Sequence, residues 1–288
     1  MNLHDAALDA PAAPAAKVPG RLPADKYTWQ TVTSIHRWTG HLFSFRTTRD
    51  RGFRFTPGQF ARLGVHRDDH HGGKSGPRDV WRAYSIVSAD YDEFLEFYSI
   101  VVPDGEFTTR LAQLREGDRL MIEKAAYGFL TLDRFEGGRD LWLLSSGTGI
   151  APFISILHDL SAWEQYGRLI LVHSVRQADE LAYRDTVEAL RTHEVFGEEL
   201  AANPGKLVYV PIVTRERIDG ALCARIPALL GSGALEARAG VRLDPKRSRV
   251  MICGNPDLVD DLRRHLTLAG YQVSRRGQPA QLAVENYW

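Results

Sequence analysis

The first half of the chain alternates between apolar and polar residues over short runs, as β-strands with one buried face do. Turn signals such as Thr56-Pro57-Gly58 and Glu116-Gly117-Asp118 separate these runs. Such closely spaced strands predict a small antiparallel Greek-key β-barrel. The expected strands are 27–38, 42–48, 59–65, 81–87, 93–102 and 119–124.

From Asp140 onward the pattern changes to apolar runs that alternate with helical periodicity. Strands are expected at 141–144, 169–173, 207–213 and 249–252, and helices from Ala151, over 179–192 and between Pro256 and Gly270, the last capped by Asn255. This alternation predicts an α/β doubly wound parallel sheet. The longest apolar run, 141–157, contains Ser145-Ser146-Gly147-Thr148-Gly149 and Pro152, and therefore predicts a strand, a turn and a helix rather than a membrane span.

The two patterns predict two domains, one over residues 25–137 and one over 138–288. A chain of 288 residues is long enough for two hydrophobic cores. Residues 1–24 are rich in Ala and Pro and lack the cationic start and apolar core of a secretory signal, so a disordered tail is expected there.

Charge and cysteine content exclude several classes of function. Lys plus Arg and Asp plus Glu balance at 36 each, so no global field favours nucleic acid or an anionic membrane as a partner. The two cysteines, Cys223 and Cys253, provide no disulfide framework and fit a reducing cytoplasm. They are too few for a four-cysteine iron–sulfur cluster, so any cluster in an electron path belongs to another protein. The polar segment 66–79 has histidines and aspartates without metal-ligand spacing, and we expect a solvated loop and no metal site.

Arg82-Ala83-Tyr84-Ser85 carries the most concentrated chemistry of the first half. Arg82 offers a cationic fork suited to a phosphate, and Tyr84 offers a ring that can lie against a planar cofactor. On a strand these two side chains share one face, while Ser85 points to the other. A flavin dinucleotide would use this layout, although Arg and Tyr on an exposed strand face are common without a ligand.

A second candidate site lies within the predicted barrel, between the strands expected at 93–102 and 119–124. Thr108 and Thr109, ahead of the apolar turn 110–114, predict a capped short helix whose free N–H groups could hold an anion. A plain capped helix is the simpler interpretation.

In the second half, Gly147-Thr148-Gly149 and Cys253-Gly254-Asn255-Pro256 each follow a strand and precede a helix. Glycines let the backbone approach a pyrophosphate, although a tight turn alone would also use them. If the strand order is 3-2-1-4-5, the two turns are neighbours at the point where such sheets bind ligands. The Cys253 thiol by itself is more typical of a small buried hydrophobe than of a catalyst.

The sequence favours NADP over NAD. An NAD site usually has an acidic residue after its second strand, whereas here Ser174-Val175-Arg176 follows that strand. Arg215 and Arg225 could complete a 2′-phosphate pocket, although each arginine alone could equally be a solvated surface charge.

Together these motifs resemble the bacterial ferredoxin/flavodoxin–NADP(+) reductases, flavoproteins with an FAD-binding barrel followed by an NADP-binding domain. Arg82–Ser85 is similar to their flavin motif, 104–108 to the FAD-pyrophosphate turn, and 147–152 and 253–256 to the nicotinamide-domain turns. Residues 225–230 and the ending Val284-Glu285-Asn286-Tyr287-Trp288 are also similar. The resemblance extends from about residue 27 to residue 288.

The resemblance implies FAD contacts residue by residue. Arg82 would bind an FAD phosphate, Tyr84 would stack on the isoalloxazine, and Ser85 would hydrogen-bond the flavin near its reactive nitrogen. Backbone groups of Tyr98, Ile100 and Val101 would hold the pyrimidine edge of the flavin, and Phe107 and Thr108 would hold the pyrophosphate. Tyr287 and Trp288 would cover the flavin and the adenine, and Thr148 would complete the set of FAD contacts.

The resemblance also implies an NADP site and a catalytic set. NADP would contact Gly147, Thr148, Gly149, Cys253 and Gly254, with its 2′-phosphate on Arg176, Arg215 and Arg225. The catalytic set would be Ser85, Cys253, Glu285 and Tyr287, with Tyr84 as the fixed wall of the flavin site and Tyr287 as the movable one.

The function implied is FAD-dependent electron transfer between NADPH and a one-electron carrier, ferredoxin or flavodoxin, by a cytoplasmic monomer. Two alternatives remain. One is a reductase component that serves an oxygenase or free flavin. The other is a flavin-binding sensor or interaction module without turnover.

Overall fold

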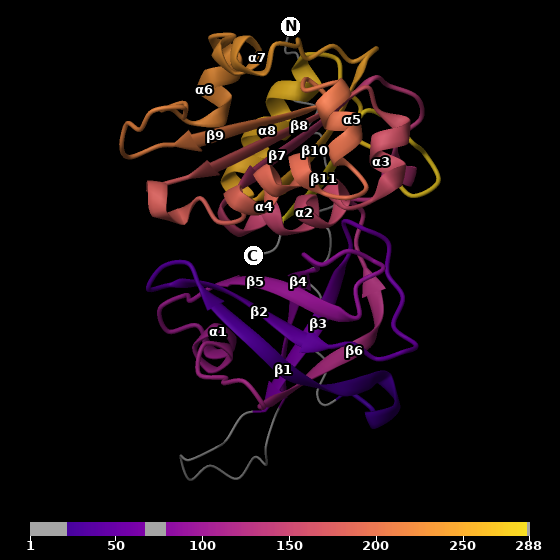
Figure 1. Ribbon diagram of the computed structural model, residues 1–288, viewed down its shortest axis with the longest axis vertical. Coiled ribbons are helices and arrows are strands. Elements are labelled where there is room, and N and C mark those ends of the chain that lie inside the picture. Colours follow the sequence, from indigo (N-terminus) through magenta and orange to yellow (C-terminus); the bar gives the residue numbers. More distant parts are fainter. Residues whose placement is uncertain (1–21, 67–78, 287–288) are drawn as a thin grey trace, which may run out of the picture.

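The computed structural model describes residues 22–66 and 79–286. Figure 1 shows a β-barrel packed against a second unit, in which helices flank a parallel sheet. The expectations for residues 1–21, for 67–78, and for Tyr287 and Trp288 lie outside the described residues. Within the described residues, no helix is long and apolar enough to cross a membrane.

The barrel is an antiparallel sheet with the strand order β4-β3-β6-β1-β2-β5. The bridge between Ile86 and Phe97 joins the two edge strands and closes the sheet. A short helix, α1 (Glu106–Leu111), packs at one end, and the interior is apolar. The strands are β1 (Tyr27–Arg37), β2 (Leu42–Thr48), β3 (Phe60–His66), β4 (Asp79–Ser85), β5 (Phe94–Ile100) and β6 (Arg119–Tyr127), preceded by a 3₁₀ turn η1 (Ala24–Lys26).

The second unit is built on a parallel sheet with the order β11-β10-β7-β8-β9. When β7 to β11 are counted as strands 1 to 5 and the sheet is read from β9, this is the 3-2-1-4-5 order considered in the sequence analysis. Apolar side chains from α2–α5 cover one face, and those from α6–α8 cover the other. The strands are β7 (Asp140–Ser146), β8 (Arg168–Val175), β9 (Leu207–Val213), β10 (Ser248–Gly254) and β11 (Leu282–Asn286). The helices are α2 (Ala151–Leu157), α3 (Leu160–Gln165), α4 (Arg184–Ala189), α5 (Gly197–Ala202), α6 (Ile226–Gly231), α7 (Ala234–Ala239) and α8 (Pro256–Leu268). The predicted fold class is therefore confirmed.

The helix predicted over 179–192 is wrong as one element. It is divided into a 3₁₀ turn η4 (Ala178–Glu180), α4 and a second turn η5 (Leu190–Thr192). The break lies at Tyr183, whose φ of 61° is left-handed. The Tyr183 hydroxyl donates to Glu96 of the barrel at 2.9 Å, so a contact between the two halves overrides the local helical pattern.

The predicted threonine cap is also wrong. Helix α1 begins at Glu106 with Gly105 as its N-cap, and no side chain caps it. Thr108 and Thr109 lie inside the helix because the apolar residues that face the barrel are Phe107 and Leu111. In contrast, Asn255 caps α8 as expected, because its side chain accepts from the amides of Asp257 and Leu258.

One apolar cluster spans the junction of the two halves. Leu42, Val87 and Tyr98 of the barrel pack with α2 and the start of α4. The buried Ser155 hydroxyl donates to the Ser88 carbonyl at 2.8 Å across the same junction. The barrel and the parallel sheet therefore meet through a packed, hydrogen-bonded surface, which holds residues of both halves in register.

Candidate functional site

A cavity of about 340 Å³ lies where the barrel meets the parallel sheet. It gathers residues from β4, β5, α1 and the turn after β7, segments that are far apart in the sequence. Its lining is Arg82, Ala83, Tyr84, Ser85, Tyr98, Ser99, Ile100, Val102, Gly105, Glu106, Phe107, Thr108, Thr148 and Ala151. The structure thus brings most of the predicted FAD residues together around one space.

Tyr84 is fixed on two sides. Its hydroxyl pairs with the Ser99 hydroxyl at 2.9 Å, and its ring lies 5.5 Å from that of Phe107. Burial raises the pKa of Tyr84 to about 12, so the phenol stays neutral and able to donate. Sequence reasoning missed Ser99; the signal was a serine placed between Tyr98 and Ile100 in a largely apolar strand.

Arg82 is exposed at the cavity, with one guanidinium nitrogen donating to the Trp81 carbonyl at 2.8 Å. Arg82, on β4, is also one of the residues that line the cavity. Ser85, at the end of the same strand, also lines the cavity although the strict strand alternation placed it on the opposite face. The strand ladder ends there, and the chain continues into the bridge at Ile86.

Tyr98 and Ile100 of β5 line the cavity, and the Tyr98 ring packs against the rings of Trp38 and Tyr183. Tyr98 is buried, and its hydroxyl has no hydrogen-bond partner among the described residues. Val101, predicted with Ile100 at the pyrimidine edge, does not line the cavity, and its amide donates to the His41 carbonyl at 2.8 Å. Only the Val101 carbonyl is left for a ligand.

The α1 end of the cavity requires a glycine. A Cβ at Gly105 would lie 2.7 Å from the Thr108 hydroxyl and 3.0 Å from the Val102 carbonyl. The Val102 amide donates to the same Thr108 hydroxyl at 3.1 Å. The turn therefore folds tightly against Thr108, with open backbone toward the cavity.

The two glycine turns of the parallel sheet touch each other. A Cβ at Gly149 would lie 2.3 Å from the Cys253 carbonyl, and a Cβ at Gly254 would lie 2.2 Å from the Ser146 hydroxyl. Strands β7 and β10 are paired, with Cys253 opposite Ser145, so both turns leave the sheet at one point. This is the convergence that the strand order predicts.

Cys253 and Glu285 are adjacent on β10 and β11 but differ in environment. Cys253 is fully buried, and burial, with Glu285 nearby, raises the pKa of its thiol. The sulfur is therefore a neutral thiol at physiological pH. Glu285 is partly exposed, and one of its carboxylate oxygens accepts from the Phe129 amide after β6, which connects the end of β11 to the barrel.

The predicted 2′-phosphate arginines divide into a pair and an outlier. Arg176 follows β8 and Arg215 follows β9, and the Arg215 amide donates to the Arg176 carbonyl at 3.0 Å. Across the described ranges, neither guanidinium has a carboxylate partner within ion-pair distance. Arg225 instead begins α6 and lies 3.9 Å from Asp261 of α8.

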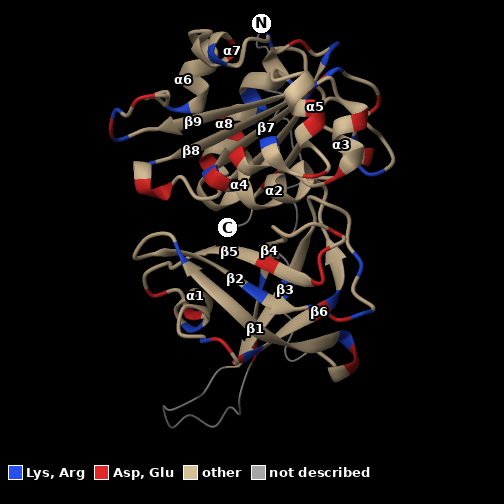
Figure 2. Cartoon of the chain, in the orientation of Figure 1, with Lys and Arg blue, Asp and Glu red and all other residues tan. Residues whose placement is uncertain are grey.

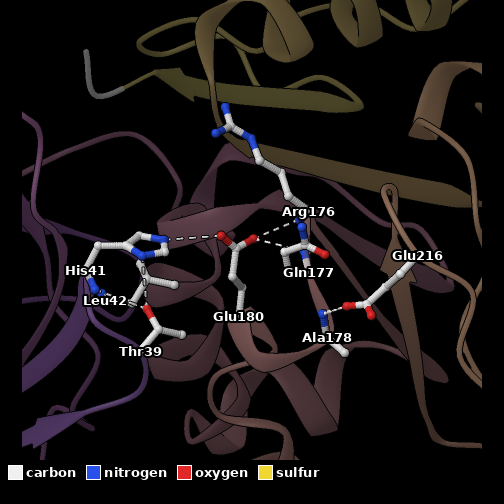
Figure 3. A network of polar contacts seen from close by, with 8 residues as sticks. All are labelled: Thr39, His41, Leu42, Arg176, Gln177, Ala178, Glu180 and Glu216. Atoms are coloured by element: carbon white, nitrogen blue, oxygen red, sulfur yellow. Dashed lines mark hydrogen bonds and ion pairs between the residues drawn. The ribbon is translucent and has the colours of Figure 1, made fainter.

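Glu180 shapes the Arg176 turn. It accepts from the amides of Arg176 and Gln177 at 2.8 and 3.2 Å and pairs with His41 of the barrel at 3.2 Å. Burial would raise the pKa of Glu180, but these hydrogen bonds lower it overall. Figure 3 shows the Arg176 guanidinium extending away from Glu180, while Glu216 binds the Ala178 amide. Glu180 after β8 and Glu216 after β9 are thus engaged with backbone amides and not with the two arginine side chains.

His173 lies directly beneath the Gly147 turn. It is fully buried, and its ring pairs with the Gly147 carbonyl at 3.2 Å. Burial lowers the pKa of His173 to about 4, whereas the unfolded chain would protonate it near its ordinary value of 6.5. Between these two pH values the unfolded state binds more protons, so stability falls as the solution becomes more acidic.

We therefore expect urea unfolding to show a loss of about 2–3 kcal/mol between pH 7.5 and pH 4.5 that His173→Gln abolishes. The matched control is His265→Gln, on the partly exposed side of α8, which should retain the wild-type pH slope. An unchanged slope in His173→Gln would contradict the assignment of a neutral, buried imidazole.

Comparison with known proteins supports one family. The model of the oxidoreductase NAD-binding domain matches residues 143–264. A ferredoxin–NADP reductase from Pseudomonas aeruginosa is 42% identical over 259 residues, which are 89% of this chain and 95% of that protein. The chain belongs to the ferredoxin–NADP reductase family.

Other members of the family agree with this placement. A flavodoxin/ferredoxin–NADP reductase from Escherichia coli is 37% identical over 90% of this chain and 99% of its own length. The crystal structure of a ferredoxin–NADP(+) reductase from Neisseria gonorrhoeae, with bound FAD and NADP, superposes with a TM-score of 0.80 at 35% identity, over 91% of this chain and 99% of that one. The predicted family is therefore confirmed over the barrel and the parallel sheet together.

Proposed function

We propose that this member of the family is an FAD-dependent reductase that passes electrons between NADPH and a one-electron carrier protein, ferredoxin or flavodoxin. The observation that carries the proposal is the shared cavity. Tyr84 and Phe107 of the barrel line it together with Thr148 of the first glycine turn of the parallel sheet. A flavin held by the barrel would therefore be adjacent to the turn that receives a nicotinamide nucleotide.

The residues of the cavity fit FAD. The exposed Arg82 fork suits a phosphate, and Tyr98 of β5 lines the same cavity. Tyr84, whose hydroxyl and ring are both held, provides a rigid face for the isoalloxazine. The remaining contacts would come from Ser85, Ile100, Phe107, Thr108 and Thr148. When bound, FAD supplies the conversion between two-electron exchange with NADPH and single-electron exchange with a carrier.

The parallel sheet would hold NADP(H). Gly147, Gly149 and Gly254 let the backbone approach a dinucleotide at the meeting point of the two turns. Arg176 and Arg215 would take the 2′-phosphate. We propose Arg225 as a more distant contributor, because it is already beside Asp261.

The remaining site residues have proposed roles at the nicotinamide side. Cys253 would pack as a neutral thiol beneath the nicotinamide, and Glu285 would connect β11 to the barrel near the reacting atoms. Tyr287 and Trp288 follow directly on β11 and would cover the flavin and the adenine, with Tyr287 as the wall that moves.

We further propose a cytoplasmic monomer in which residues 25–137 hold FAD and residues 138–288 hold NADP(H). Both cysteines are free thiols, which fits a reducing compartment. Figure 2 shows cationic and anionic residues interspersed over both halves, which matches the balanced charge of the chain. Because the chain as a whole has no net charge to attract a carrier protein, we propose that the carrier binds to a local surface.

The purified protein should be yellow, and anaerobic NADPH should bleach its flavin absorption band. Stopped-flow absorption with NADPH and with NADH, followed by assays with ferredoxin, flavodoxin and free FMN as acceptors, tests the proposal. Reduction of a carrier protein far faster than of free FMN is the expected result. Equal or better turnover with free FMN would identify a flavin reductase, and flavin binding without reduction by NADPH would identify a non-catalytic module; either would refute the proposed function.

A further inference from the structure

A second cavity, of about 590 Å³, lies on the opposite edge of the parallel sheet from the two glycine turns. Its wall includes Asp140 and Arg168, the first residues of β7 and β8. The arrows of β8 and β9 in Figure 1 mark the carboxyl edge, so this cavity lies at the amino edge. The cofactor site described above does not use it.

Four arginines surround the cavity, against two aspartates. Arg139 and Arg247 precede β7 and β10 and are exposed, and their backbones are joined by a 2.6 Å hydrogen bond. Arg242 is exposed on the loop before β10, and Arg168 donates to the Gly240 carbonyl at 2.9 Å. Throughout the part of the chain that the structure describes, none of the four lies within ion-pair distance of a carboxylate. The lining therefore carries an excess of positive charge, with four arginines against Asp140 and Asp244.

Asp140 gives the cavity a buried polar group. It is 1% exposed, and its Oδ2 atom has no hydrogen-bond partner among the described residues. Burial raises the pKa of its carboxyl group, although Arg247, Arg168 and Arg139 act in the opposite direction. Asp140 and these three arginines attract each other, and the arginines outnumber the carboxyl group in the lining.

The loop between α7 and β10 supplies an apolar side. Val241, Leu243 and Pro245 line the cavity beside the arginines, and Val241 and Leu243 pack on the core under that face of the sheet. A volume of this size falls in the range of small-molecule sites and exceeds that of a single inorganic anion. The site therefore suits a ligand with an anionic head and an organic body.

We propose that this cavity is a second ligand site, which binds a small organic phosphate through the guanidinium groups of Arg139, Arg168, Arg242 and Arg247. Planar guanidinium forks match the oxygens of a phosphate, and four of them around one space suit a dianion. The apolar loop contacts the organic part. The site is separate from the cofactor turns, and its occupancy does not depend on the proposed function.

Calorimetric titration of the FAD-loaded protein tests the site, with saturating NADP(+) present so that the cofactor turns are occupied. The probe is AMP, with inorganic phosphate and adenosine as separate arms. We expect saturable AMP binding, weaker competition by inorganic phosphate and no binding of adenosine. The double variant Arg139→Ala/Arg247→Ala should weaken AMP binding at least about tenfold, because each removes a charge-assisted hydrogen bond.

Two further variants make the result decisive. Arg263→Ala/Arg264→Ala removes two arginines from α8, away from the cavity, and should bind AMP as the wild type does. Asp140→Asn removes the acidic group from the cavity wall at nearly the same volume, so AMP should bind as tightly or more tightly. Thermal unfolding verifies that each variant is folded. Absence of saturable AMP binding, equal losses in the two double variants, or weaker binding by Asp140→Asn would overturn the proposal.

Discussion

Replacing both Arg176 and Arg215 by alanine is expected to lower kcat/KM for NADPH by about 100-fold or more, while kcat/KM for NADH changes by less than about threefold. Arg176 follows β8 and Arg215 follows β9, and the Arg215 amide donates to the Arg176 carbonyl at 3.0 Å. Neither guanidinium is paired with a carboxylate among the described residues. A 2′-phosphate would receive charge-assisted hydrogen bonds from both, and NADH lacks that group.

Steady-state kinetics with both nucleotides measures this selectivity. Arg217→Ala is the matched control, because Arg217 is an exposed arginine on the loop after β9, two residues beyond Arg215. Arg225→Ala should have a smaller effect than either member of the pair, since Arg225 begins α6 and lies near Asp261. If the double variant lost the same factor with NADH as with NADPH, the pair would have no role in recognising the 2′-phosphate.

The sequence predicted this pair only in part, and the reason is local. The motif Ser174-Val175-Arg176 places a cation after the second strand of the sheet and favours NADP, whereas Asp179 and Glu180, three and four residues beyond Arg176, weaken that case slightly. In the structure the Glu180 carboxylate is occupied by two backbone amides and by His41 of the barrel. Sequence spacing cannot reveal a partner 139 residues away.

The fold was more predictable than its irregularities. The barrel strands show alternating apolar residues, and the second half shows apolar runs that alternate with helical periodicity. Both patterns depend on which residues of a short segment are buried, and they can be read directly from the sequence. The break at Tyr183 and the Ser99 partner of Tyr84 instead depend on contacts between distant segments. Strand β11 (Leu282–Asn286) was absent from the predicted elements, because the run is short and forms a strand through its pairing with β10.

Gly254→Ala is expected to destabilise the protein by about 3 kcal/mol or more and to abolish NADPH binding. A Cβ at this position would lie 2.2 Å from the Ser146 hydroxyl and 2.9 Å from the Ser146 carbonyl, and φ is +147°, a conformation that non-glycine residues rarely adopt. Relief of the clash would push β10 from β7 and separate the two turns that converge on the cofactor. Gly149→Ala should act in the same way, because its Cβ would lie 2.3 Å from the Cys253 carbonyl.

Urea unfolding and NADPH titration of the FAD-loaded variants measure both effects. Gly231→Ala is the control, because a Cβ there meets no atom within 4 Å and the site ends helix α6 away from the turns; its stability should stay within about 1 kcal/mol of wild type. Ser146→Ala combined with Gly254→Ala removes the nearest atom but leaves the Ser146 carbonyl and the unfavourable φ. We therefore expect that double variant to recover only part of the stability. Wild-type stability and NADPH affinity in Gly254→Ala would show that the turns tolerate separation and that their contact does not form the cofactor site.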